Sequence, residues 1–144
     1  MPTGKPYFGT KVTTTPTWFR LSTWGEETDV SIIVASTARD PNSPNSTSIL
    51  RAGLILGKIT ASGKYAQYNN AASDGTETAV GILVNTIDLR DSTGTQQDTP
   101  AVMATVAEID ANNIPASGTN YTGLDANAKA DFAASETAQI VVRS

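Results

Sequence analysis

The sequence contains no cysteine and no histidine among its 144 residues. The absence of cysteine excludes disulfide bonds and thiolate metal sites. The absence of histidine removes the side chain best suited to proton transfer near neutral pH, and with it every nucleophile that a histidine would activate. An enzyme would have to work with carboxylates, lysine, tyrosine or serine alone. We therefore expect no catalytic residue, no cofactor and no metal.

Large apolar side chains are also scarce. Ile, Leu, Val and Phe together account for 29 of the 144 residues, close to the level at which chains begin to remain unfolded. The net charge of −4 is modest, which favours a folded domain over an expanded acidic chain. A chain of this length forms one domain, and a small domain with little apolar material often completes its burial against another subunit or a partner.

Long hydrophobic runs are absent as well. The longest aliphatic runs, such as Leu54–Leu56, are far too short to cross a membrane. The N-terminus lacks the apolar stretch of a secretory signal. We therefore expect a protein that is made in a cytoplasm and has no membrane partner.

Two patterns resemble ligand-binding motifs and fail in detail. Gly53–Ile59 has three residues between its glycines, where a phosphate-binding loop needs four, and Ile59 replaces the magnesium-binding Ser or Thr. The glycines are better explained by a strand that bends or lets another backbone approach. The carboxylates at 26–29 and 88–91 lack the order of a calcium loop and are expected to be solvated.

The few aromatic residues are concentrated at one end. Five of the nine lie in the first 24 positions, together with three of the seven prolines and no acidic residue. Because exposed rings are costly in water and tryptophan is a favoured interface anchor, we predict that residues 1–28 form an extended arm that orders on a partner. An arm folded back on its own domain and a disordered tail are the alternatives.

Charge is divided between this arm and the rest of the chain. Residues 1–25 carry a charge of +3, and the remainder carries −7. Three positive charges are few for non-specific nucleic-acid binding, and the acidic remainder would be repelled by phosphates. We therefore expect no direct nucleic-acid partner.

The remaining sequence predicts a compact, mainly β domain. Residues 29–48 combine a short β-branched strand with a loop rich in Pro, Asn and Ser, and residues 49–144 form the β-rich main part. Strands are expected within 50–60, 64–68, 79–84 and 138–142, with a hairpin between the first two, a tight turn at Asp74–Gly75 and a polar loop over 88–100. Residues 101–109 fit a strand or a short helix, and their β-branched content favours a strand. Leu124, Ala128 and Phe132 stand four apart, which predicts one short helix.

Three blocks of sequence together resemble a known family. They are LRAGLILGKIT with SGKY after it from residue 50, DGTETAVGILV from residue 74, and AKADFAASETAQIVV from residue 128. In this order and spacing the blocks resemble the lambda-type phage head decoration proteins. The resemblance implies a mainly β fold of the β-clip type, with one or two short helices and an extended N-terminal arm.

The resemblance also implies a function. Members of this family stand as homotrimers on the outer surface of an icosahedral head, between capsomers, where they cement the major capsid protein after the shell has expanded. They help the shell to resist the pressure of packaged DNA. Their arm orders on the shell and extends a sheet of the major capsid protein. This chain would accordingly be a virion component.

On this hypothesis the arm supplies the capsid contacts. An added strand gives affinity through main-chain hydrogen bonds, while alternate side chains fill pockets. The large rings would be anchors, and the basic residues would meet an acidic shell. The candidate partner-binding residues are Tyr7, Phe8, Lys11, Trp18, Phe19, Arg20 and Trp24.

The alternative function is a β-rich carbohydrate- or receptor-binding module of a phage tail or fibre. Such a module needs an exposed aromatic platform on the folded domain. The residues available for one are Tyr65, Tyr68, Tyr121 and Phe132.

Overall fold

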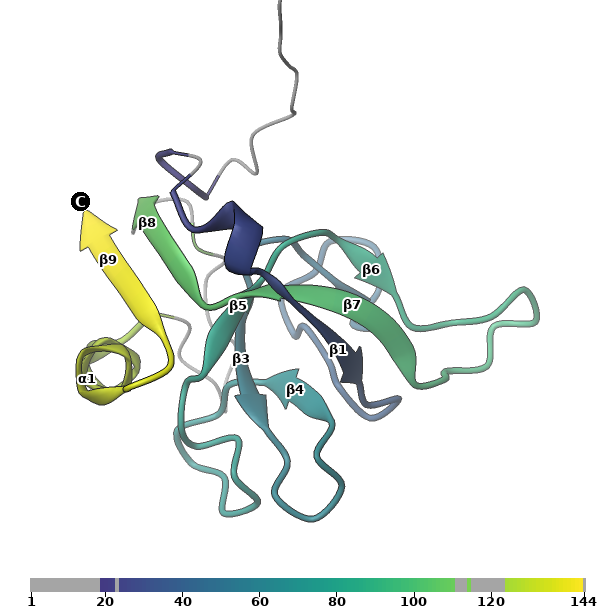
Figure 1. The fold of residues 1–144 in the computed structure, drawn as a ribbon. Coiled ribbons are helices and arrows are strands. Elements are labelled where there is room, and N and C mark those ends of the chain that lie inside the picture. The colour runs from purple at the N-terminus through teal and green to yellow at the C-terminus, as the bar shows by residue number, and fades with distance from the viewer. Residues whose placement is uncertain (1–18, 23, 111–113, 115–123, 144) are drawn as a thin grey trace, which may run out of the picture.

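A closed five-stranded β-barrel forms the centre of the computed structural model, which describes residues 19–22, 24–110, 114 and 124–143 (Figure 1). Most neighbours around the barrel are antiparallel, and one junction, between β1 and β4, is parallel. In their order around the barrel, the strands are β1 (Val30–Val34), β4 (Tyr65–Gln67), β3 (Ile55–Lys58), β5 (Gly81–Leu83) and β7 (Thr99–Ala104).

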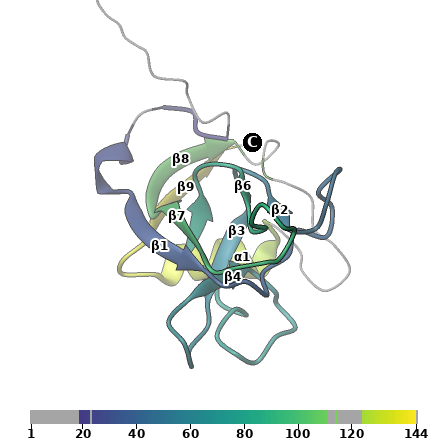
Figure 2. The same ribbon diagram turned by 90° about the vertical axis from the view of Figure 1, so that its right-hand side faces the viewer.

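Smaller elements flank the barrel on two sides. On one side, β2 (Ile49–Leu50) pairs with β6 (Ile87–Asp88). On the other side, β8 (Val106–Asp110) pairs in parallel with β9 (Gln139–Arg143), beside helix α1 (Ala126–Ala134). Figures 1 and 2 show these two groups on opposite sides of the barrel. A short 3-10 helix, η2 (Glu26–Thr28), leads into β1.

Apolar side chains from the barrel, from both flanking strand pairs and from α1 meet in one core. In β1, Ile32 and Val34 are buried while Ser31 and Ile33 are exposed, as expected for a strand with one face on the core. All of β5 and most of β3 are buried, in keeping with their unbroken apolar sequences. The largest fully buried side chains are Tyr68, Phe19, Leu50, Leu54, Ile55, Leu56, Ile82, Leu83, Leu89, Ile109 and Val34.

The prediction of a mainly β fold is confirmed. The predicted hairpin is β3–β4, with Leu56 opposite Gln67 and Lys58 opposite Tyr65. The predicted helix is α1, in which Ala128 and Phe132 are buried. It begins at Ala126 because the Asp125 carboxylate caps it, accepting a hydrogen bond from the N–H of Ala128 at 2.7 Å.

Two segments differ from their predicted bounds. Residues 101–109 are not one element but the end of β7 and most of β8, separated at Thr105. The predicted polar loop over 88–100 is shorter than expected, because Asp88 ends β6 and Thr99 begins β7. Both differences arise because strand ends are decided by their partners across the sheet, which local sequence does not reveal. The division of the chain at residues 28 and 48 stays a prediction.

The glycines of the phosphate-loop-like segment have a structural explanation. At Gly57, a Cβ atom would lie 2.5 Å from the Cα of Thr76, so only glycine lets the two backbones approach. Gly53 has a φ of 93°, a conformation that other residues rarely adopt. The sequence-based interpretation of these glycines is thus confirmed.

Candidate partner interface

The first described residues extend the β8–β9 sheet. The N–H of Leu21 donates to the carbonyl of Glu108 at 2.8 Å, and the N–H of Asp110 donates to the carbonyl of Phe19 at 3.0 Å. Arg20 lies opposite Ile109 in an antiparallel bridge. We call residues 19–22 and Trp24 the entry segment. It forms a third, short extended piece on the free side of β8 and anchors the start of the chain to its own domain.

The side chains of Phe19 and Arg20 are buried within the subunit. Phe19 is fully buried in the core, and Arg20 is 6% exposed. The guanidinium of Arg20 donates to both carboxylate oxygens of Asp29, at 2.9 and 2.7 Å, and to the carbonyl of Val106 at 3.0 Å. The contact of these two residues with a partner stays a prediction, and in the free subunit both side chains are buried in their own domain. They hold the entry segment in place, because the apolar ring is buried in the core and the Arg20 guanidinium pairs with Asp29 within the domain.

Leu21 and Trp24, in contrast, are presented to solvent. Leu21 is 48% exposed and Trp24 is 47% exposed. Leu21 lies across from Glu108 of β8, which in turn lies across from the exposed Val141 of β9. The outer face of the small sheet therefore carries apolar side chains on both sides of a glutamate. Glu108 forms an ion pair with Arg143 at 3.0 Å.

The backbone after Trp24 is closely constrained. Gly25 has a φ of 86°, and a Cβ atom there would lie 2.1 Å from the carbonyl oxygen of Val106. Only glycine can therefore occupy this turn. Both the N–H and the hydroxyl of Thr28 donate to the carbonyl of Gly25, at 3.0 and 2.8 Å. Trp24 is thus an exposed ring on a fixed backbone, which lowers the entropy lost when a partner covers it.

The remaining predicted contact residues, Tyr7, Phe8, Lys11 and Trp18, lie outside the described residues. Sequence reasoning missed Leu21, since a single leucine among Ser and Thr carries no pattern. The signal that could have found it is the pairing of Arg20 with Ile109, 89 positions later, which only the fold reveals.

The aromatic platform required by the carbohydrate-binding alternative is not formed by the described residues. Tyr68 and Phe132 are buried, and Tyr65 is half-buried. The hydroxyl of Tyr68 donates to Asp125 at 3.2 Å, so this ring has a structural role. The fourth candidate, Tyr121, lies outside the described residues.

Carboxylates with lowered pKa values are found in the turns, away from the entry segment. The Arg90 guanidinium lowers the pKa of Asp88 to about 2. Hydrogen bonds from the Thr93 hydroxyl and from backbone N–H groups lower the pKa of Asp91, and the Lys64 ammonium lowers that of Asp98. Each of these carboxylates bonds neighbours that define a turn or join two loops. Their shifts are explained by local structure.

Within the described ranges, no group of three acidic side chains is placed to hold a metal ion. The helix of this part of the chain is also too short and too polar to span a membrane.

Comparison with known proteins identifies the family. A search of curated proteins found no match. A family model, that of the bacteriophage lambda head decoration protein D, matches residues 31–140, from the second residue of β1 to the second residue of β9. The match covers well over half of the chain and agrees with the three sequence blocks that suggested it. Its start at Ser31 leaves the entry segment outside it. The chain therefore belongs to the bacteriophage lambda head decoration protein D family, whose members are components of the phage head.

Proposed function

We propose that this protein cements an expanded phage head, binding the outer surface of the shell as a homotrimer and stabilising it against the pressure of packaged DNA. Family membership supports the decoration role. The single structural observation that carries the proposal is the exposed pair Leu21 and Trp24, at the base of an aromatic-rich N-terminus. The partner is the major capsid protein, and catalysis has no part in this function.

The entry segment would act as the fixed base of the capsid-binding arm. Phe19 and Arg20 attach the entry segment to the domain. A force on the arm would therefore be transmitted directly to β8. In the proposed complex, Trp24 and Leu21 pack on the shell next to the base. Tyr7, Phe8 and Trp18 add further rings, and Lys11 meets acidic groups.

The ring of Trp24 is large enough to matter energetically. It is 47% exposed. A side chain of this size offers roughly 200 Å², and burial contributes about 25 cal/mol per Å², so covering the exposed part would contribute on the order of 2 kcal/mol. Removing it should weaken binding roughly 30-fold.

Trimerisation would supply burial that one subunit lacks. The described residues of a single chain leave five large apolar side chains at least 39% exposed: Leu21, Trp24, Val30, Ile33 and Val141. For a chain with so few apolar residues, contacts between subunits are the expected means of covering some of them.

The test is co-sedimentation with emptied, expanded heads. We expect Trp24→Ala to weaken head binding by about one to two orders of magnitude, with little change in the melting temperature of the free protein, since the ring is half exposed. Trp24→Phe is the matched control and should retain most of the binding. Undiminished binding of Trp24→Ala would contradict the proposed site, and a trimer that fails to bind any expanded head would contradict the proposed function.

A further inference from the structure

Strand β9 has one edge that is paired and one that the described residues leave open. The entry segment bonds to one edge of β8, and β9 lies along the other edge of β8. β9 pairs with β8 over its whole length, from Gln139 opposite Val106 to Arg143 opposite Asp110. Among the described residues, no strand lies along the other edge of β9, which is at the margin of the molecule in Figure 1.

The register of this parallel pair shows which main-chain groups face the open edge. The N–H of Gln139 donates to the carbonyl of Thr105 at 2.7 Å, so the polar main-chain groups of Gln139 point towards β8. Successive residues of a strand direct these groups alternately to its two sides. Val141 therefore also bonds to β8, whereas the N–H and carbonyl groups of Ile140 and Val142 point to the open edge.

This edge lacks the features that usually protect an edge strand. Natural edge strands are very short, or carry a proline, a bulge or a lysine that prevents further pairing. β9 has five residues, Gln-Ile-Val-Val-Arg, and its charged residue is the last one. The barrel is closed, and β2 and β6 have only two residues each. Of the described strands, β9 is therefore the longest with a wholly unpaired edge.

The edge is complementary to itself when two copies of it run antiparallel. Residues that exchange hydrogen bonds in such a pair must both direct their main-chain groups towards each other. If Ile140 lies opposite Val142 of the second copy, and Val142 opposite Ile140 of the second copy, every outward N–H and carbonyl of these residues is bonded. A shift by two positions would leave one of the two residues without a counterpart inside β9.

The side chains on the exposed face fit the same register. It places Val141 opposite its own copy, and Gln139 opposite Arg143 of the second copy, so that no like charges meet. Val141 is 39% exposed in one subunit and would be covered by its counterpart. This match in hydrogen bonds, length and charge favours a second copy of the chain over an unrelated strand.

We propose that two copies of this chain associate by antiparallel pairing of their β9 edges, centred on Val141. An antiparallel pair of identical strands requires a twofold axis, which a cyclic trimer does not contain. The contact would therefore join copies that belong to different trimers. It does not depend on the proposed capsid-binding site.

The absence of cysteine allows the pairing to be tested by disulfide trapping. In the proposed register, Val141 and its counterpart exchange no hydrogen bonds, and the Cα atoms of such a pair lie about 4.5 Å apart, within disulfide range. On mild oxidation of the full-length Val141→Cys protein, we expect rapid formation of a covalent dimer.

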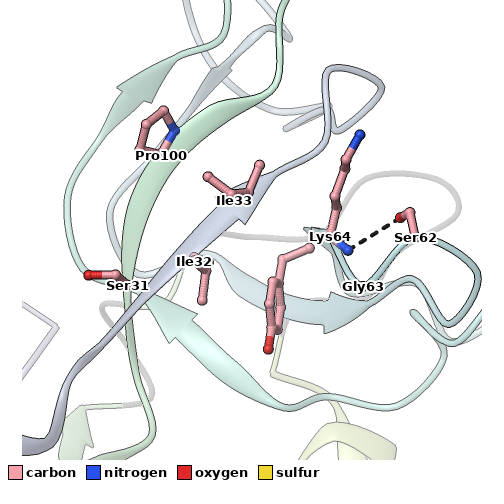
Figure 3. Close-up of a pocket in the computed structure, with 8 residues that line it drawn as sticks. Ser31, Ile32, Ile33, Ser62, Gly63, Lys64 and Pro100 are labelled. Atoms are coloured by element: carbon pink, nitrogen blue, oxygen red, sulfur yellow. Dashed lines mark hydrogen bonds between the residues drawn. The ribbon is translucent and has the colours of Figure 1, made fainter.

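Ile33→Cys is the matched control for this variant. Ile33 is 44% exposed, similar to Val141, but it lies on the barrel. Figure 3 shows it beside a groove of about 470 Å³ between β1, β7 and the turn before β4. Because this site is remote from the β9 edge, Ile33→Cys should dimerise several-fold more slowly than Val141→Cys.

Two further variants test the register. Gln139→Cys and Arg143→Cys should each dimerise slowly alone, since the proposed register separates identical residues by four positions, about 13 Å. An equal mixture of the two proteins should form a mixed disulfide rapidly, because residue 139 lies opposite residue 143 of the second copy. Rapid dimerisation of Arg143→Cys alone, without a mixed disulfide, would contradict the centre at Val141.

Hydrogen exchange of the unaltered protein provides a second measurement. In dilute solution, we expect the N–H of Val141 to exchange slowly, because it bonds to β8, and the N–H groups of Ile140 and Val142 to exchange rapidly. At high protein concentration, exchange at Ile140 and Val142 should become slower while exchange at Val141 stays the same. Only the first two N–H groups enter the new pair.

Three results would overturn the proposal. Equal dimerisation rates for Val141→Cys and Ile33→Cys would show chance collisions. Exchange rates at Ile140 and Val142 that do not change with protein concentration would show that the edge stays open. Slower exchange at these two residues only on emptied heads, without dimerisation of Val141→Cys, would show that a strand of the shell occupies the edge.

Discussion

Single residues at the start of the described chain perform two separate tasks. Phe19 and Arg20 are buried and hold the entry segment, whereas Leu21 and Trp24 are exposed. Arg20 lies on the buried face of the small sheet with Ile109, and Leu21 lies on the other face with Glu108, because alternate side chains of an extended segment point to opposite faces. The amino-acid types alone, two rings and a cation in a basic segment, could not separate the structural residues from the exposed ones.

The ion pair between Arg20 and Asp29 should be important for stability. Its side chains are 2% and 13% exposed, so Arg20→Ala would leave a largely buried carboxylate unpaired. We expect a loss of about 3 kcal/mol in the free energy of unfolding, measured by urea denaturation.

Arg143→Ala provides the matched control for this ion pair. Arg143 pairs with Glu108 at the surface, where its side chain is 62% exposed, and removing such a pair costs about 0.5 kcal/mol or less. Similar losses for the two variants would show that the Arg20 pair does not hold the entry segment.

At the scale of elements, the short helix depends on a single capping residue. Asp125 accepts from the N–H of Ala128 at 2.7 Å and from the hydroxyl of Tyr68 at 3.2 Å, thereby joining the helix start to the barrel. Leu124, Ala128 and Phe132 revealed the helix from their spacing alone. The hydrogen bond between Tyr68 and Asp125 was not predictable, because these two residues are 57 positions apart.

Asp125→Ala should destabilise the helix start by about 1 kcal/mol, the usual cost of losing such a cap. We expect this variant to have a lower melting temperature and a weaker α-helical signal in circular dichroism. Asp125→Asn keeps an acceptor oxygen at the same place and should cost much less. A larger loss with Asn than with Ala would show that the carboxylate has another role.

Strand ends were the least predictable feature at this scale. The β-branched content correctly favoured strand structure over 101–109. The strand is interrupted at Thr105, however, so that β7 belongs to the barrel and β8 belongs to a different sheet. Local preferences are the same on both sides of the break. The choice of sheet depends on contacts with β1 and β9, which are distant in sequence.

At the scale of the whole molecule, several carboxylates make folding stability depend on pH. Bonds to Arg90 lower the pKa of Asp88 to about 2, and those of Asp74, Asp91 and Asp98 are also lowered. The unfolded chain, in which these groups have ordinary pKa values, binds more protons as the pH falls. The stability that these groups contribute is therefore present above about pH 4 and lost as the pH falls towards 2.

We expect the melting temperature to fall steadily between about pH 4 and pH 2, measured by scanning calorimetry. Asp88→Asn should flatten part of this decrease, because one titrating group is removed. Asp110→Asn is a control from outside these turns. A pH profile for Asp88→Asn that is identical to that of the unchanged protein would contradict the role of this carboxylate.

By itself, the sequence determined the fold class, the short helix, the glycine positions and the family, because these depend on local composition, spacing and contiguous blocks. Only the tertiary structure decided which of the aromatic and basic residues near the start are buried, and that β7 and β8 join different sheets. Both follow from strand pairing between distant segments, such as Arg20 with Ile109 and Ser31 with Val102. Hydrogen bonds across a sheet join residues that no local pattern connects.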